Sequence, residues 1–162
     1  MSDEIPRVVL DTVVFIQCLI RGKGPSAGCM AQLRAGRFVL LMSDAIFDEL
    51  ENVAQRPRLV AKYPFLAPDK VSAFMSEIRS LAVNVAHPPT VFSLPRDPKD
   101  EPLIDLAIAG RANYLVTWND RHLTYLMRQD TPEGMDFRKR FPNLKIVSPP
   151  DFLAAIIQSP PP

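Results

Sequence analysis

Short apolar runs alternate with longer segments of helical periodicity along this chain. The runs are rich in Val, Ile and Leu and are bounded by polar or turn residues, which is typical of buried strands. They predict strands at residues 7–11, 37–43, 83–86, 113–117 and 144–148. Between them, apolar residues recur every three or four positions and predict helices at residues 12–20, 26–36, 44–55, 69–82, 103–112 and 149–158.

Residues that start or stop helices support this division. We expect Ser26 to cap the second helix, Gly36 to end it, and Ser43 to cap the third. Residues 56–65 are interpreted as a loose connector, and residues 87–102 as a proline-punctuated loop. Loops of that length in compact domains are usually functional or disordered. The alternation of strands and helices predicts a parallel sheet with helices on both faces, an α/β fold.

One acid, Asp11, interrupts the apolar run "VVLDTVVFIQ". A buried carboxylate is costly unless it is paired or binds a metal ion. Three interpretations are open: Asp11 ends the strand and caps the next helix, it lies at a solvated strand end, or it is a metal ligand.

Length and composition limit the number of domains, the type of nucleic-acid contact and the cellular location, but they do not identify the function. The length of 162 residues fits one domain, over residues 1–158, followed by a proline-rich tail at 159–162. The net charge of +1 excludes a strongly basic arm but leaves room for a local nucleic-acid-binding patch. The start "MSDEIPR" lacks the apolar core of a signal peptide, and no run could span a membrane. Cys18 and Cys29 fit a reducing compartment, so we expect a cytoplasmic location.

Polar residues follow the strands where ligands bind in open parallel sheets, outside the carboxyl ends. Converging carboxylates repel one another and need protons or cations to neutralise them. Oxygen-ligated Mg²⁺ or Mn²⁺ suits them, since the chain has two histidines only. Each acid also has an ordinary structural explanation as a cap, a turn residue or a solvated side chain. The residues in question are Asp11, Thr12, Asp44, Asp48, Glu49, Glu51, Asp97, Asp100, Glu101, Thr117, Trp118, Asn119 and Asp120.

Four segments together resemble the PIN domain family, in particular its bacterial toxin-like (VapC-like) members. They are "VVLDT", "SDAIFDELENVAQRPRL", "LPRDPKDEPLIDLAIAGRANYLVTWNDRHL" and "IVSPPDFLA". Their order and spacing match over nearly the whole chain. The resemblance implies a three-layer α/β/α sandwich around a Rossmann-like parallel sheet. It also implies a Mg²⁺- or Mn²⁺-dependent ribonuclease acting on single-stranded RNA.

The resemblance assigns site residues as well. Asp11, Glu49 and Asp100 match the family's metal-binding acids, and Asn119 stands at a fourth catalytic position that is often Asp. Thr12 and Thr117 match hydroxyl positions near the metal. Asp97 could assist from the loop. Val13 replaces a common Asn, so that Val13 and Asn119 both reduce the polarity of the site and could weaken its activity.

The resemblance further implies a small antitoxin partner and a homodimer. Trp118, Arg121 and His122 are candidate RNA contacts; the alternatives are that Trp118 and His122 pack and that Arg121 pairs with an acid. A second hypothesis is a PIN-like module that binds RNA or protein without catalysis. A dinucleotide-binding protein is disfavoured, because no G-x-G-x-x-G follows the first strand.

Overall fold

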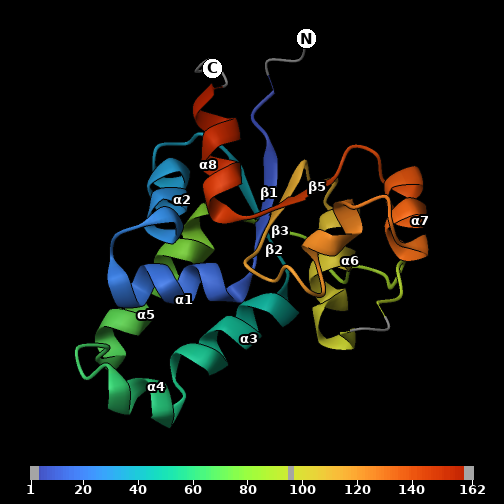
Figure 1. Cartoon of the computed structure of the whole chain (residues 1–162). Coiled ribbons are helices and arrows are strands. Elements are labelled where there is room, and N and C mark those ends of the chain that lie inside the picture. The colour runs from blue at the N-terminus through green and yellow to red at the C-terminus, as the bar shows by residue number, and fades with distance from the viewer. Residues whose placement is uncertain (1–3, 95–96, 159–162) are drawn as a thin grey trace.

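A parallel sheet of strand order β3-β2-β1-β4-β5 forms the centre of the molecule (Figure 1). The computed structural model describes residues 4–94 and 97–158. All neighbouring strands in this part of the chain pair in parallel, as the sequence predicted. The strands are β1 (Arg7–Leu10), β2 (Val39–Met42), β3 (Ala82–Asn84), β4 (Tyr114–Val116) and β5 (Lys145–Val147).

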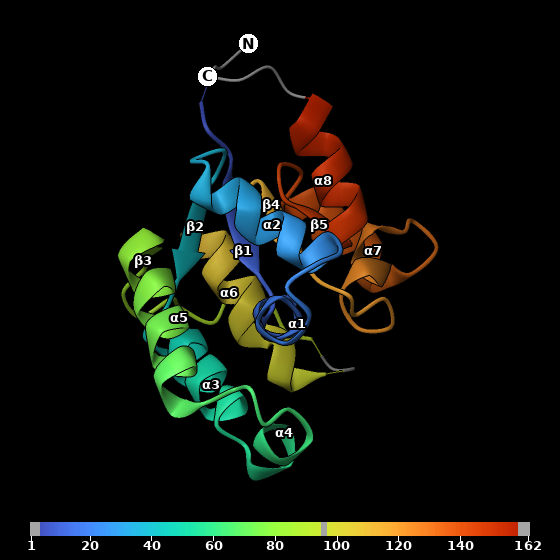
Figure 2. The same ribbon diagram turned by 90° about the vertical axis from the view of Figure 1, so that its left-hand side faces the viewer.

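Helices cover both faces of this sheet. In Figure 1, α1, α2, α5 and α8 lie to the left of the sheet and α6 and α7 to the right. Figure 2, in which that left-hand side faces the viewer, shows α1, α2 and α8 in front of the strands, which confirms the three-layer α/β/α arrangement. The helices are α1 (Thr12–Arg21), α2 (Pro25–Arg34), α3 (Asp44–Ala54), α4 (Pro57–Lys62), α5 (Pro68–Leu81), α6 (Glu101–Ala109), α7 (Pro132–Arg140) and α8 (Pro149–Gln158), with 3-10 turns η1 (Pro98–Asp100) and η2 (Thr124–Met127).

The central strand explains why one edge of the sheet can carry function. Val8, Val9 and Leu10 of β1 are buried, because the strand has a paired neighbour on each side and helices over each face. β1 and β4 run side by side, with Leu10 opposite Val116. Their next residues, Asp11 and Thr117, therefore emerge together at the carboxyl edge. This edge faces downward in Figure 1, where α1 and α6 begin.

Several local expectations are confirmed and others are wrong. Ser43 caps α3, since its hydroxyl accepts a hydrogen bond from the Ile46 N–H. Ser26 does not cap α2: the helix begins one residue earlier at Pro25, and the capping position is Gly24. The ring of Pro25 suits the first helical turn, where a backbone N–H has no helical partner, and this moves the boundary.

Two further elements were not anticipated from the pattern. The connector at residues 56–65 contains α4, again with a proline at its start. α7 follows β4 and η2, and Thr131 caps it through a hydrogen bond from the Gly134 N–H. Its apolar periodicity is weak, since Phe137 and Gly134 are its buried residues.

The structure does not test the predicted domain boundary or the predicted tail. One domain over residues 1–158 stays a prediction. The tail at 159–162 lies outside the described residues. Within the described residues, no helix has the length and apolar character needed to cross a membrane.

Candidate acidic active site at the carboxyl edge of the sheet

Asp11 and Thr117 connect the ends of the two central strands. The Thr117 hydroxyl donates a hydrogen bond of 2.7 Å to Asp11 Oδ2. The same hydroxyl oxygen accepts a hydrogen bond of 3.0 Å from the Asn119 N–H. Thr117 is fully buried, so its geometry is fixed by packing. The two predicted residues therefore form one hydrogen-bonded unit with the loop that follows β4.

Asp100 comes from a different element and meets this unit through Asn119. It ends the turn η1 and precedes α6. The Asn119 side-chain NH2 group donates a hydrogen bond of 2.8 Å to Asp100 Oδ2, and the Asn119 side-chain oxygen Oδ1 accepts one of 3.1 Å from the His122 N–H. The predicted residues Asp11, Thr117, Asn119 and Asp100 are thus brought to one edge from three segments distant in the sequence.

Asp97 and His122 extend the same cluster. His122 Nδ1 lies 3.0 Å from Asp97 Oδ2. Asp97, Asp100 and His122 each offer one potential ligand atom, and these atoms lie within 4.8 Å of one another. Asp97 also accepts a hydrogen bond from the Lys99 N–H, which fixes it at the start of η1.

Glu49 stands at the side of the cluster. It lies on α3 and is exposed. The hydroxyl of the buried Thr12 donates 3.3 Å to Glu49 Oε2, so Thr12 links Glu49 to the start of α1, next to Asp11. Of the three predicted metal ligands, Asp100 belongs to the group of residues within 4.8 Å, whereas Asp11 and Glu49 do not.

The negative charges of these carboxylates repel one another, and burial adds to the cost of ionising them. Burial raises the pKa of Asp11, and the charge of Asp97 adds to this rise. Burial, together with the charges of Asp11 and Asp97, raises the pKa of Asp100 to about 6. In the described part of the chain, no Lys or Arg forms an ion pair with Asp11, Asp97 or Asp100. Neutral donors and one imidazole hold them instead.

A divalent cation fits this donor set. Carboxylate and amide oxygens are the ligands that Mg²⁺ and Mn²⁺ prefer, and clustered carboxylates with raised pKa values are stabilised by a cation between them. Asp11 and Asp100 could supply charged oxygens. The Asn119 side chain directs its NH2 group at Asp100 and its oxygen at the His122 N–H, so it supports the site through hydrogen bonds. His122 adds a nitrogen donor that Mn²⁺ accepts more readily than Mg²⁺.

Two further carboxylates hold the long loop in place: Glu101, which the sequence named as a candidate, and Asp105, which it did not. Asp105 is buried on α6 and accepts a hydrogen bond from the Val91 N–H, and Glu101 accepts one of 2.8 Å from the Leu94 N–H. The loop that leads to Asp97 is therefore fastened to the helix that follows Asp100. An acid in the apolar stretch "LIDLA" was the available indication, as with Asp11.

The three candidate RNA contacts separate in the structure. His122 joins the acidic cluster through Asp97. Arg121 is exposed and forms no ion pair among the described residues. Trp118 is partly exposed, and its indole N–H donates 3.3 Å to Ser26 Oγ on α2. Trp118 thus contacts α2, whereas the next residue, Asn119, contacts Asp100.

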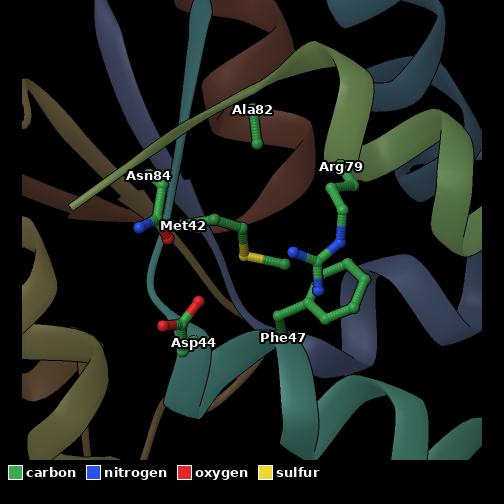
Figure 3. A pocket seen from close by; sticks show the side chains of 6 residues that line it. All are labelled: Met42, Asp44, Phe47, Arg79, Ala82 and Asn84. Atoms are coloured by element: carbon green, nitrogen blue, oxygen red, sulfur yellow. The ribbon is translucent and has the colours of Figure 1, made fainter. Parts of the chain in front are cut away.

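A small hollow of about 180 Å³ lies at the carboxyl ends of β2 and β3. Figure 3 shows the Arg79 guanidinium against the Phe47 ring, 3.9 Å from its centroid, with Asp44 and Asn84 at the other side. None of the proposed metal ligands lines it; its residues are Met42, Asp44, Phe47, Arg79, Ala82 and Asn84. The acidic cluster is accordingly the better candidate for an active site.

Comparisons with known proteins agree with this geometry. The sequence model of the PIN domain matches residues 7–121, well over half of the chain. No curated protein matches the sequence. Among solved structures, the chain is similar to one in the crystal structure of VapBC2 from Rickettsia felis bound to a DNA fragment from their promoter. The identity is 16%, the match covers 88% of this chain and 98% of that one, and the TM-score is 0.51, a likeness of fold. The chain belongs to the PIN domain family.

Proposed function

We propose that the protein is a metal-dependent ribonuclease that hydrolyses phosphodiester bonds of single-stranded RNA. The observation that supports this best is the cluster of mutually repelling carboxylates at one sheet edge, in which the pKa values of Asp11 and Asp100 are raised. Such a group loses stability in the ionised state unless a cation is present. Membership of the PIN domain family, in which the sequence resemblance implies nuclease activity, points the same way.

Asp11, Glu49 and Asp100 would hold Mg²⁺ or Mn²⁺, with Asn119 assisting through a bound water. A bound ion of this kind activates water and stabilises charge on a phosphate. Thr117 orients the Asp11 carboxylate, Thr12 orients Glu49, and Asn119 orients Asp100 through hydrogen bonds. Asp97 holds the His122 ring. On this proposal, His122 and Arg121 would contact RNA phosphates.

The biological setting is also part of the proposal. The fold likeness to a chain of a VapBC2 structure, together with the motifs in the sequence, supports the role of a toxin in a toxin–antitoxin pair. On this proposal the partner is a small antitoxin protein, the active form is a homodimer, and the site of action is the cytoplasm.

The direct experiment is cleavage of single-stranded RNA by purified protein with Mn²⁺. We expect Asp11→Asn and Asp100→Asn each to abolish cleavage and Glu49→Gln to reduce it strongly. Asp48→Asn is the matched control, because Asp48 is an exposed acid next to Glu49 on the same helix and makes no contact with the cluster. Cleavage that survives both Asp11→Asn and Asp100→Asn would overturn the proposal.

A second candidate is a PIN-like module that binds RNA or protein without cleaving RNA. Two observations favour it: Val13 is 47% exposed at the first turn of α1, beside Asp11, and Asn119 places an amide against Asp100. Both reduce the negative charge or polarity of the site. This candidate expects no heat on titration with Mn²⁺ and RNA binding that is insensitive to EDTA, so calorimetry distinguishes it from the nuclease.

A further inference from the structure

The residues that follow β4 point to two different places. Thr117 and Asn119 contact Asp11 and Asp100, whereas Trp118 between them contacts Ser26 of α2. The indole is 41% exposed. Both sequence neighbours of Trp118 contact acids of the candidate active site. Its exposed indole could therefore contact a part of the substrate that extends beyond these acids.

The exposed indole forms one wall of a hollow of about 230 Å³ between the end of α1 and the start of α2. This hollow is separate from the one in Figure 3. Two hydrogen bonds fix its floor: Ser26, which is buried, donates 2.7 Å to Gln17 Oε1 and accepts from the Trp118 N–H. The lining residues are Gln17, Arg21, Lys23, Gly24, Pro25, Ser26 and Trp118.

The charge of this hollow is opposite to that of the acidic cluster. Arg21 and Lys23 are both exposed on its rim. Neither forms an ion pair with an acid in the part of the chain that the structure describes. Two unpaired cations beside an aromatic face are the combination that binds single-stranded nucleic acid, because the ring stacks on a base and the cations contact the backbone.

We propose that this hollow, the Trp118 pocket, binds a nucleotide of the single strand that flanks the phosphate at the acidic cluster. The base stacks on the Trp118 indole, and Arg21 and Lys23 contact phosphate oxygens. The Gln17 side chain offers hydrogen bonds to a base edge, which gives the pocket a means of preferring one base. The inference rests on the proposed RNA substrate but not on cleavage. It also gives a reason for Ser26 to be polar and buried: Ser26 holds the stacking face in place.

The pocket can be tested by binding alone, in EDTA, where no cleavage is measured. Trp118 is the single tryptophan of the chain, so intrinsic fluorescence reports on the pocket directly. We expect a short single-stranded oligouridylate to quench this fluorescence in a saturable manner. A labelled copy of the oligonucleotide, followed by anisotropy, should bind Trp118→Ala about tenfold or more weakly, as expected for loss of one stacked base. Trp118→Phe should recover part of the loss.

The charge contacts need their own variants. Arg21→Gln and Lys23→Gln should each weaken binding and reduce its salt dependence by about one phosphate contact. Lys145→Gln is the matched control, since Lys145 is an exposed lysine at the start of β5, at the amino ends of the strands, whereas Trp118 follows the carboxyl end of β4. Circular dichroism verifies that every variant is folded.

The outcomes separate this inference from the proposed function. Absence of saturable quenching, wild-type binding by Trp118→Ala, or an equal loss in Lys145→Gln overturns the pocket. Weaker binding by the pocket variants supports it, even when the protein with Mn²⁺ cleaves no RNA and the nuclease proposal fails. Cleavage that depends on Asp11 and Asp100, with pocket variants that bind normally, leaves the nuclease standing and removes the pocket.

Discussion

The Thr117 hydroxyl donates a 2.7 Å hydrogen bond to Asp11 Oδ2 and so joins the carboxyl ends of β4 and β1. The two residues directly follow the two central strands, and the chain continues from each of them into a different segment. Asp11 leads into α1, and Thr117 leads to Trp118 and Asn119. The side chain that interrupts the first apolar run is therefore both the end of a strand and a member of the candidate site.

Removing this hydroxyl should weaken cation binding. In Thr117→Val the shape is retained, but Asp11 Oδ2 loses its donor and the Asn119 N–H loses its acceptor. Groups that orient metal ligands typically contribute about 10- to 100-fold to metal affinity. We expect a loss of this size for Mn²⁺, measured by calorimetry. Thr117→Ser keeps the hydroxyl and should bind Mn²⁺ nearly as well as wild type; equal losses in both variants would exclude the hydrogen bond as the cause.

The raised pKa of Asp100, about 6, predicts how stability depends on pH without a cation. The folded state holds the Asp100 proton more tightly than the unfolded state, where the pKa is about 4. The resulting stabilisation is complete below about pH 4 and is lost as the pH rises through about 6. Asp100 is partly exposed, so solvent screening reduces the effect, and we expect a loss of about 1–2 kcal/mol.

Urea unfolding in EDTA at several pH values checks this expectation. Asp100→Asn removes the titrating group, so the variant should lose less stability than wild type between about pH 4 and 7. Mn²⁺ favours the ionised carboxylate and should restore the stability of wild type near neutral pH. Equal pH dependence in wild type and Asp100→Asn would contradict the raised pKa.

The sequence predicted the parallel sheet and the meeting of the residues after β1 and β4 for one physical reason. Parallel strands expose their carboxyl ends at one edge, so residues after Leu10 and Val116 must meet whatever the loops do. Side-chain direction within a loop follows no such rule. That Trp118 points to Ser26 while its neighbours point to the acids depends on the local backbone, and the pattern could not show it.

Contacts between residues on long loops could not be predicted from the sequence pattern. Asp97 and His122 come within 3.0 Å of each other from separate loops, which no periodicity encodes. The small helix α4 was missed because it buries no residue and has no apolar face to detect. The sequence named Asp97 and His122 as candidates, but their contact with each other depends on the loops and could not be predicted.

Loss of the Asp105 hydrogen bond should loosen the loop that carries Asp97. Asp105→Leu fills similar space but leaves the Val91 N–H without its acceptor, which costs about 1–3 kcal/mol. We expect faster hydrogen exchange at Val91 and in the segment that follows it, and weaker Mn²⁺ binding. Asp105→Asn keeps an acceptor oxygen and should exchange as wild type does. Unchanged exchange in Asp105→Leu would show that the loop is held by other contacts.

Asn119→Asp tests whether the amide at this position limits the charge of the site. In the protein, the Asn119 amide donates 2.8 Å to Asp100; a carboxylate there would instead oppose it. Two carboxylates at about 4 Å repel by about 4 kcal/mol at an effective dielectric constant of 20. Proton uptake and solvent relieve part of this, so we expect about 2 kcal/mol lower stability in EDTA near neutral pH.

The same variant should bind Mn²⁺ more tightly, by about tenfold or more, because the added carboxylate is neutralised when the cation binds. Thermal unfolding with EDTA and with Mn²⁺ measures both effects, and the rise in Tm on adding Mn²⁺ should exceed that of wild type. Asn113→Asp is the control: it makes the same change before β4, where the side-chain oxygen accepts from the Arg7 N–H in either form. If Asn119→Asp loses no stability in EDTA, or gains no affinity for Mn²⁺, the charge at residue 119 does not interact with the carboxylates of Asp11 and Asp100. If both effects appear, the amide at 119 sets the balance between a stable metal-free protein and a strongly metal-binding one.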